Sequence, residues 1–184
     1  FDLPTSMLYT ITFNPSLDYY LKVNNIRRGA VNRAAGEKLI PGGKGINVSL
    51  ALKELGNDTT GLGFFAGFTG RAILSEINER GLKNYFIEVE GQTRINVKIK
   101  SVAEPDINGE GAYVTAGDVT RLVKKLKKNL RSDDWVILSG SVPPTLPGTA
   151  YADFLDELKA PKGVNIVVDA SGKLLTESLR HKPF

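Results

Sequence analysis

The sequence contains no cysteine and only one histidine among its 184 residues. The lack of cysteine excludes disulfides, thiolate chemistry and metal sites with cysteine ligands. His181 alone cannot form a histidine-based metal site, because such sites use several protein ligands. We therefore expect no metal-binding residues in this chain.

Long apolar runs are also missing. No stretch approaches the roughly 20 apolar residues that a membrane helix needs, and the start lacks the basic-then-apolar pattern of a signal peptide. We expect a cytoplasmic protein with no membrane partner. Met7 is the only methionine, so residues 1–6 are interpreted as an artificial extension and the natural protein is expected to begin at Met7.

Charge of one sign is not in large excess, since 24 basic residues face 20 acidic ones and give a net charge of +4. The densest basic group surrounds the polar face of one predicted amphipathic helix; it consists of Lys124, Lys125, Lys127 and Lys128. Neither aromatic residues nor glycines are interspersed among these lysines, so a solvated helix face is favoured over a nucleic-acid site. We expect no nucleic-acid partner.

From about residue 115 onward, predicted helices and strands alternate. A helix is expected to begin at a capping Asp118, and further helices are expected in 149–159 and 173–180. The strands between them are expected in DWVILSGS (134–141) and VNIVVDAS (164–171), and the first is almost continuously apolar, as in a parallel sheet covered on both faces. This pattern predicts an α/β fold with a mostly parallel sheet flanked by helices.

Two earlier segments, 19–26 and 94–102, alternate between apolar and polar residues. In the second, Ile95, Val97 and Ile99 are expected on a buried face, with the polar residues facing solvent or a ligand. Such strands do not suit a sheet buried on both faces. We interpret them as a separate small antiparallel sheet, a lid with strands near 19–40 and 94–102.

Residues 41–56, PGGKGINVSLALKELG, place a glycine-rich turn at the start of a predicted helix. A helix N-terminus presents free N–H groups and the positive end of a dipole, and glycines allow an anion to approach closely. With the charge of Lys44, the turn at Gly42 and Gly43 suits a phosphate or a polarised sugar hydroxyl. It is not a Walker A loop, because Gly45 stands where Ser or Thr would bind magnesium. A tight turn with a solvated lysine remains an alternative.

Other polar residues follow predicted strands or begin predicted elements. Asp18 and Ser139 follow strands at the carboxyl edge, where ligands bind in open α/β sheets. Arg94 begins the alternating segment, and its guanidinium suits bidentate phosphate contact. Asn47 lies in the first turn of the glycine-led helix. Each residue also has a purely structural alternative. These are a turn cap for Asp18, a chain reversal for Ser139, a surface position for Arg94 and a local helix cap for Asn47.

Several segments together resemble the PfkB, or ribokinase-like, sugar kinases, and in particular the 1-phosphofructokinase and tagatose-6-phosphate kinase branch. They are NPSLD (14–18), PGGKGINVSLALKELG (41–56), GFTG (67–70), TRINVKIK (93–100) and WVILSGSVPP (135–144). The resemblance implies a Rossmann-like α/β domain with a β lid over the sugar. It also implies transfer of the γ-phosphoryl group of ATP, with Mg²⁺, to a hydroxyl of a sugar phosphate.

The resemblance also implies roles for individual residues. It assigns Asp18 to sugar hydroxyls, Gly42, Gly43, Lys44 and Asn47 to the acceptor-sugar motif, Arg94 to the substrate phosphate and Ser139 to a further substrate contact. Residues 7–184 would be the N-terminal part of a single ribokinase-like domain. The GAGD-type motif with the catalytic base, the NxxE motif and most of the nucleotide pocket belong to the family's C-terminal half, which is absent here. We therefore expect no catalytic residue in this chain and no activity from it alone.

The sequence leaves more than one candidate for the substrate and for the functional class. By their resemblance to the 1-phosphofructokinase branch, the segments GFTG, TRINVKIK and SGSVPP favour fructose 1-phosphate as the substrate. Tagatose 6-phosphate and fructose 6-phosphate are the alternatives. A non-catalytic sugar-phosphate-binding protein is a second class. A dinucleotide-binding oxidoreductase is disfavoured, because NPSLD stands where GxGxxG would follow the first strand. The lid makes a homodimer plausible.

Overall fold

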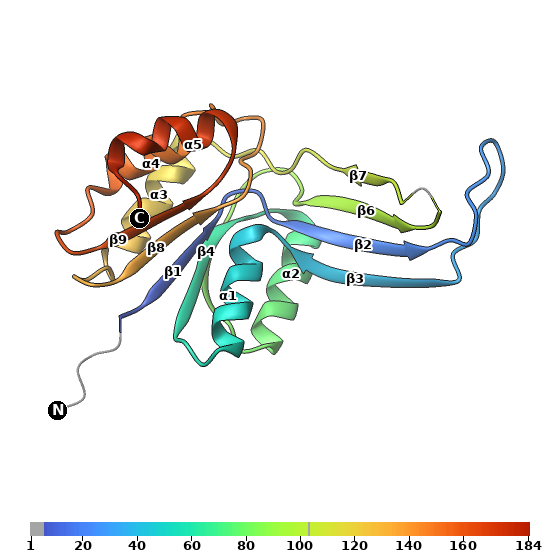
Figure 1. Ribbon diagram of the computed structural model, residues 1–184, viewed down its shortest axis with the longest axis horizontal. Helices are drawn as coiled ribbons and strands as arrows, with labels where there is room; N and C mark the ends of the chain where they lie inside the picture. Colours follow the sequence, from blue (N-terminus) through green and yellow to red (C-terminus); the bar gives the residue numbers. More distant parts are fainter. Residues whose placement is uncertain (1–5, 103) are drawn as a thin grey trace.

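The computed structural model describes residues 6–102 and 104–184, which form two sheets and five α-helices (Figure 1). The larger sheet has the order β5-β4-β1-β8-β9, and every pairing in it is parallel. Its strands are β1 (Leu8–Thr12), β4 (Thr59–Phe65), β5 (Lys83–Glu88), β8 (Trp135–Ser139) and β9 (Asn165–Asp169). The predicted extension at 1–6 falls outside the described residues except for its last position.

Helices cover both faces of this sheet, as the sequence predicts (Figure 1). On one face lie α1 (Lys44–Glu54) and α2 (Gly67–Glu79), and on the other α3 (Ala116–Lys127), α4 (Ala150–Leu158) and α5 (Gly172–Ser178), with a 3₁₀ turn at Leu179–His181. None of the described helices combines the length and the apolar character that crossing a membrane requires.

Strand β1 shows how the two faces differ. Tyr9 and Ile11 belong to the apolar core with α3 and α4, whereas Thr10 turns to α1 and its hydroxyl lies 2.5 Å from that of Ser49. Just beyond β1, Phe13 packs edge-to-face on Phe64, Tyr151 and Phe154, with ring centroids 5.3 to 5.7 Å apart. This aromatic cluster fixes the chain where β1 ends, directly before the polar segment 14–18.

The second sheet extends away from the body of the molecule (Figure 1). It has the order β3-β2-β6-β7, with β3 (Gly36–Gly42), β2 (Ser16–Lys22), β6 (Arg94–Lys100) and β7 (Asp106–Asn108). The expected separate sheet is confirmed, but its pairing is mixed. β2 pairs antiparallel with β3 and parallel with β6, because the chain returns to β6 only after passing through the larger sheet.

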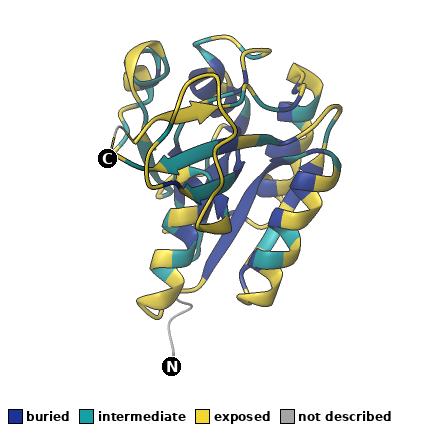
Figure 2. Cartoon of the chain, turned by 90° about the vertical axis from the view of Figure 1, so that its right-hand side faces the viewer, coloured by how far each residue is buried: buried dark blue, intermediate teal, exposed yellow. Residues whose placement is uncertain are grey.

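The second sheet has a polar inner face and an apolar outer face. Its register aligns Ser16, Asp18 and Tyr20 of β2 with Arg94, Asn96 and Lys98 of β6, and these side chains form the inner face. The expected burial of β6 is wrong for Ile95, which is 40% exposed, whereas Asn96 is only 7% exposed. Within the described residues, the outer face packs on the body of the protein only at Leu17, which is buried with Ile46 and Ile73. Farther along the strands this face is exposed, as at Leu39 and Ile107, and Figure 2 shows exposed and half-buried strands here.

The start of α3 differs from the prediction. Its N-cap is Thr115, and Asp118 is the third helical residue of a capping box. The Asp118 backbone N–H donates to the Thr115 hydroxyl at 3.2 Å, and the Thr115 backbone N–H donates to the Asp118 carboxylate at 3.0 Å. The helix therefore begins one turn earlier than a capping Asp118 would require.

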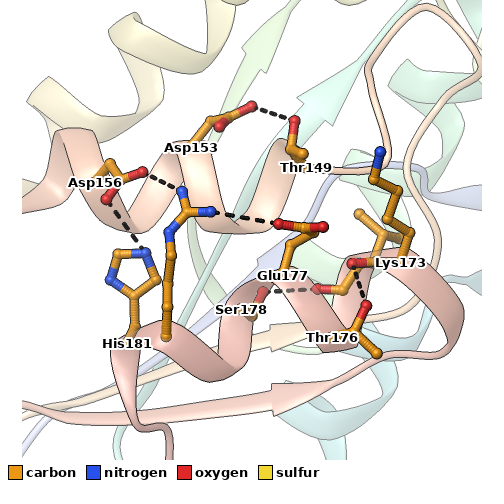
Figure 3. Close-up of polar contacts among 10 residues, drawn as sticks. Thr149, Asp153, Asp156, Lys173, Thr176, Glu177, Ser178 and His181 are labelled. Atoms are coloured by element: carbon orange, nitrogen blue, oxygen red, sulfur yellow. Dashed lines mark hydrogen bonds and ion pairs between the residues drawn. The ribbon is translucent and has the colours of Figure 1, made fainter.

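Ion pairs join α4 to the last helical turns (Figure 3). Asp156 of α4 contacts Arg180 and lies 3.3 Å from His181 Nε2. Arg180 also lies 3.6 Å from Glu177, and the Thr149 hydroxyl donates to Asp153 at 2.8 Å. The single histidine thus contributes to helix packing.

Candidate functional site

A pocket of about 320 Å³ lies at the carboxyl edge of the larger sheet, next to the second sheet. Its walls come from the ends of β1, β8 and β9, the start of α1 and the start of β6; they are Thr12, Asn14, Lys44, Arg94, Ser139, Gly140, Ser141, Ala170, Ser171 and Leu174. This is the edge at which open α/β sheets bind ligands. The structure thus brings together Lys44, Arg94 and Ser139, three of the predicted site residues.

The glycine turn brings the start of α1 close to β1 and β2. Gly43 is the N-cap with a φ of 115°, which favours glycine. A Cβ atom on Gly42 would lie 2.7 Å from Asp18 Oδ1, and one on Gly45 would lie 2.3 Å from Thr12 Oγ1. No side chain caps the helix, and its first turn has no acidic residue. Its N-terminal amides therefore have no side-chain cap, and the positive end of the helix dipole lies where Lys44 forms part of the pocket wall.

Lys44 extends from this helix start across the pocket. Its ammonium group lies 3.2 Å from Asp169 Oδ1 at the end of β9, and both side chains are more than half exposed. Gly140 leaves room for the lysine stem, since a Cβ there would lie 3.3 Å from Lys44 Cβ. The Gly140 carbonyl accepts a hydrogen bond from the Tyr151 hydroxyl at 3.0 Å. Burial raises the pKa of Tyr151, so this hydroxyl stays protonated.

Asp18 and Asn96 form a pair on the inner face of the second sheet. Asp18 Oδ1 accepts hydrogen bonds from the Ser16 hydroxyl at 2.7 Å and from Asn96 Nδ2 at 3.0 Å. Asn96 Oδ1 is buried and has no hydrogen-bond partner among the described residues. A carboxylate beside an amide with a free acceptor suits the recognition of neighbouring sugar hydroxyls.

Arg94 lies between this pair and the pocket. Its Nη2 donates to the Asn14 carbonyl at 3.0 Å, and its buried Nε finds no acceptor within the described part of the chain. Burial lowers the pKa of Arg94, and the carboxylate of Asp18 opposes that effect. A guanidinium stays charged in proteins, so Arg94 brings a permanent cation with an unused donor to the pocket.

Two buried hydroxyl oxygens beside the pocket also lack partners among the described residues: Thr12 Oγ1 and Ser139 Oγ. Leaving a buried polar group unsatisfied costs about 1–3 kcal/mol, so such groups commonly mark a site. Sequence reasoning found Ser139 but missed Thr12 and Asn14. The sequence signal for both residues was their place at or just after the end of the first predicted strand. In the folded chain, Asn14 Nδ2 donates a hydrogen bond to the Glu110 carbonyl at 3.1 Å.

Asn47 is not brought together with the other residues. Its backbone N–H donates to the Gly43 carbonyl at 3.0 Å, and its side chain is exposed and outside the pocket lining. A larger hollow of about 560 Å³ lies at the far end of the second sheet, but none of the predicted site residues lines it. The candidate site is therefore the smaller pocket with the adjoining Asp18–Asn96 pair.

The described residues offer little for a metal ion. No group of three or more potential metal-ligating side chains occurs among them, and the carboxylate of Asp169 is paired with Lys44. The segment Thr115–Asp118 reads TAGD, but the carboxylate of Asp118 is used in the capping box of α3. The pocket thus suits a phosphate group, whereas these residues do not form a Mg²⁺ site by themselves.

Comparisons with known proteins agree with this chemistry. A family described as pfkB family carbohydrate kinase matches residues 12–182. A 1-phosphofructokinase of Bacillus subtilis (strain 168) is 39% identical over 97% of this chain and 58% of its own length. A D-tagatose-1-phosphate kinase of Bacillus licheniformis is 34% identical, with the same coverage. The chain thus spans less than two thirds of the curated relatives it matches.

The fold also resembles solved structures. Phosphofructokinase-2 from Escherichia coli in complex with fructose-6-phosphate superposes with a TM-score of 0.85 and 25% identity, over 96% of this chain and 58% of that one. The superposition supports the arrangement of a parallel sheet with a second, mixed sheet at its edge.

Proposed function

Since this chain belongs to the pfkB family of carbohydrate kinases, we propose that it is the acceptor-sugar part of a kinase that phosphorylates a ketohexose phosphate. The observation that carries this proposal is the convergence of Lys44, Arg94 and Ser139 on one pocket beside Asp18. Two cations, a helix N-terminus and a carboxylate for hydroxyls match the needs of phosphoryl transfer to a sugar, which depends on positioning and charge neutralisation.

The proposed substrate is fructose 1-phosphate, with fructose 1,6-bisphosphate as the product. The name of the Bacillus subtilis relative supports it. Tagatose 6-phosphate and fructose 6-phosphate are the alternatives, since relatives include a protein named tagatose-6-phosphate kinase and a structural neighbour holds fructose-6-phosphate. We propose the cytoplasm as the compartment.

The site residues then have complementary roles. Asp18, supported by Asn96, holds hydroxyls of the sugar, and the turn at Gly42 and Gly43 lets the acceptor approach the start of α1. Lys44 neutralises negative charge near the acceptor hydroxyl, and Arg94 contacts the phosphate of the substrate. Ser139 turns its unpartnered hydroxyl to the ligand. Asn47 is the least supported of these assignments, because its side chain lies outside the pocket lining.

ATP and Mg²⁺ are the proposed co-substrate and cofactor of the whole protein. ATP supplies the phosphoryl group, and the cations of the pocket fit a phosphate. The magnesium ion needs ligands that the described residues do not assemble. We therefore propose that residues 7–184 bind the acceptor as the N-terminal part of one domain and do not catalyse transfer alone.

Calorimetric titration with fructose 1-phosphate tests this proposal. We expect the chain to bind, and Arg94→Ala to weaken binding at least tenfold, as loss of a charge-assisted contact of about 1.5–3 kcal/mol would do. Arg71→Ala is the matched control, because Arg71 is exposed, pairs with Glu88 and does not line the pocket. If the chain and the longer gene product both fail to bind, the proposed function is wrong.

Turnover assays separate the two functional classes. We expect no phosphorylation of fructose 1-phosphate by this chain with ATP and Mg²⁺, and phosphorylation by a longer gene product that carries the GAGD-type motif. Turnover by this chain would contradict its proposed inactivity. Binding without turnover in the longer product would favour a non-catalytic sugar-phosphate-binding protein.

The outer face of the second sheet supports the proposal of a homodimer through a lid. Leu39, Ile95 and Ile107 expose 57%, 40% and 62% of their surface there, and a second copy would cover the same apolar patch. Sedimentation velocity tests this: we expect the chain to form dimers and Ile95→Lys to form monomers. A monomer at all concentrations would contradict the proposal.

A further inference from the structure

Asn14 lies at a point where three segments of the chain meet. It follows the end of β1, lines the pocket and exposes only 6% of its surface. Its backbone carbonyl accepts a hydrogen bond from Arg94 Nη2 at 3.0 Å, and its side-chain Nδ2 donates to the Glu110 carbonyl at 3.1 Å. One residue thus contacts the start of β6 through its backbone and the segment after β7 through its side chain.

The segment 109–114, here named the strap, leads from β7 back to α3 (Figure 1). At its start, the Gly109 backbone N–H donates to the Ile95 carbonyl at 3.1 Å. A Cβ atom on Gly109 would lie 3.1 Å from Arg94 Cβ. At its other end, Val114 is buried in the core. The strap therefore runs directly beside the stem of Arg94 and is fixed to the body of the protein beyond it.

The middle of the strap lies against the side chain of Asn14. Gly111 has a φ of 117°, and a Cβ atom there would lie 2.3 Å from Asn14 Oδ1. The side-chain amide of Asn14 is therefore held on one side by its hydrogen bond to Glu110 and on the other by the backbone of Gly111.

These contacts enclose Arg94. The strap lies beside its stem, the Asn14 carbonyl holds Nη2, and the Asn14 side chain ties the strap to the same point. Arg94 Nε is buried and has no acceptor among the described residues, so this donor is held in a fixed direction and is unused. A long side chain that is ordered before binding loses less conformational entropy when the ligand arrives.

We propose that Asn14 is a positioning residue, which together with the strap holds Arg94 in the orientation that receives an anionic group of the ligand. This inference rests on the proposed function, in which Arg94 contacts the phosphate of the sugar. Asn14 acts through Arg94 in this role and not through a contact of its own with the ligand. Its effect on binding should therefore exist only while Arg94 is present.

A double-mutant cycle, measured by calorimetric titration with fructose 1-phosphate, tests the proposal. We expect Asn14→Ala to weaken binding by about threefold to tenfold, because one long side chain is no longer ordered in advance. In the Arg94→Ala background, the same substitution should change the affinity by less than about twofold, since the side chain that Asn14 positions is missing. A direct contact of Asn14 with the ligand, or a general loosening of the site, would weaken binding by the same factor in both backgrounds.

Gly111→Ala tests the same contact from the strap, because Gly111 does not line the pocket. Its Cβ atom would displace the Asn14 side chain, so we expect a similar loss of affinity that again disappears in the Arg94→Ala background. Gly29→Ala is the matched control. Gly29 also has a positive φ, of 70°, but nothing lies within 4 Å of a Cβ atom there, so the affinity should not change.

The outcomes separate this inference from the proposed function. Circular dichroism verifies that each variant is folded, and the cycle is run on the longer gene product if only that protein binds. If Arg94→Ala weakens binding but the Asn14 and Gly111 variants have no effect, or have equal effects with and without Arg94, Asn14 is not a positioning residue and the proposed function stands. If neither this chain nor the longer product binds fructose 1-phosphate, both proposals fail.

Discussion

The carboxylate of Asp18 accepts a hydrogen bond of 3.0 Å from the side-chain amide of Asn96, a residue 78 positions later in the sequence. The two side chains meet because β2 and β6 pair in parallel with these residues in register. This relationship joins the segment 14–18 to the segment 93–100, and it places a carboxylate and an amide on the face of the second sheet that also carries Arg94. Binding of a sugar should therefore depend on both residues.

Asp18→Asn keeps the size of the side chain and removes its charge. We expect the affinity for fructose 1-phosphate to fall at least tenfold, because hydrogen bonds from hydroxyls to a carboxylate contribute about 1.5–3 kcal/mol. Isothermal titration measures the change. Asp58→Asn is the matched control, since Asp58 is exposed and its weak pairing with Lys83 spans 3.8 Å. Equal losses in both variants would argue against a role for Asp18 in binding.

The Lys44–Asp169 pair should contribute little to stability. Both side chains are more than half exposed, and such pairs contribute about 0–1 kcal/mol. We expect Asp169→Asn to change the free energy of unfolding in urea by less than about 1 kcal/mol. Lys44→Met should also change the free energy of unfolding by less than about 1 kcal/mol. It should, however, weaken the binding of the sugar phosphate. A large loss of stability in both variants would show that the pair is structural.

Gly45 should tolerate no side chain. A Cβ atom there would lie 2.3 Å from Thr12 Oγ1 and 2.8 Å from the Ile11 carbonyl oxygen. We expect Gly45→Ala to destabilise the protein by about 1–3 kcal/mol, as overpacking does, when unfolding is followed by circular dichroism. Gly36→Ala is the comparison, because nothing lies within 4 Å of a Cβ at that position. Similar effects at both sites would contradict the close approach of α1 to β1.

The capping box of α3 predicts a pH dependence. Burial raises the pKa of Asp118, but hydrogen bonds from Thr115 and Arg121 outweigh it and hold the pKa below its ordinary value of 3.8. The ionised carboxylate thus stabilises the folded state above that value, and the contribution is lost as the pH falls through the folded pKa. Asp118→Ala should cost about 1 kcal/mol at pH 7.

Urea unfolding of wild type and Asp118→Ala between pH 7 and pH 3 measures this effect. The difference between the two proteins should be constant down to about pH 4 and then decrease. A difference that does not change with pH would show that the cap acts through packing and not through the charge of Asp118.

The sequence by itself determined the fold class and named candidate residues for the site. Continuous apolar strands such as β8 and the helical spacing in α3 are local patterns, so they predict a parallel sheet with helices on both faces. The glycines before α1 and the carboxylate of Asp18 are also local signals. Hydrogen-bonding capacity and backbone freedom belong to the residue type, which is why these candidates could be named before their partners were known.

Only the tertiary structure decided which elements meet. The alternation in β6 could not reveal its parallel pairing with β2, and it wrongly predicted a buried Ile95. β5 and β7 were missed, because short strands on the outside of a sheet carry little periodicity. Strand pairing depends on contacts distant in sequence, so the placing of Arg94 in the pocket, and of Asn47 outside its lining, comes from the folded chain as a whole.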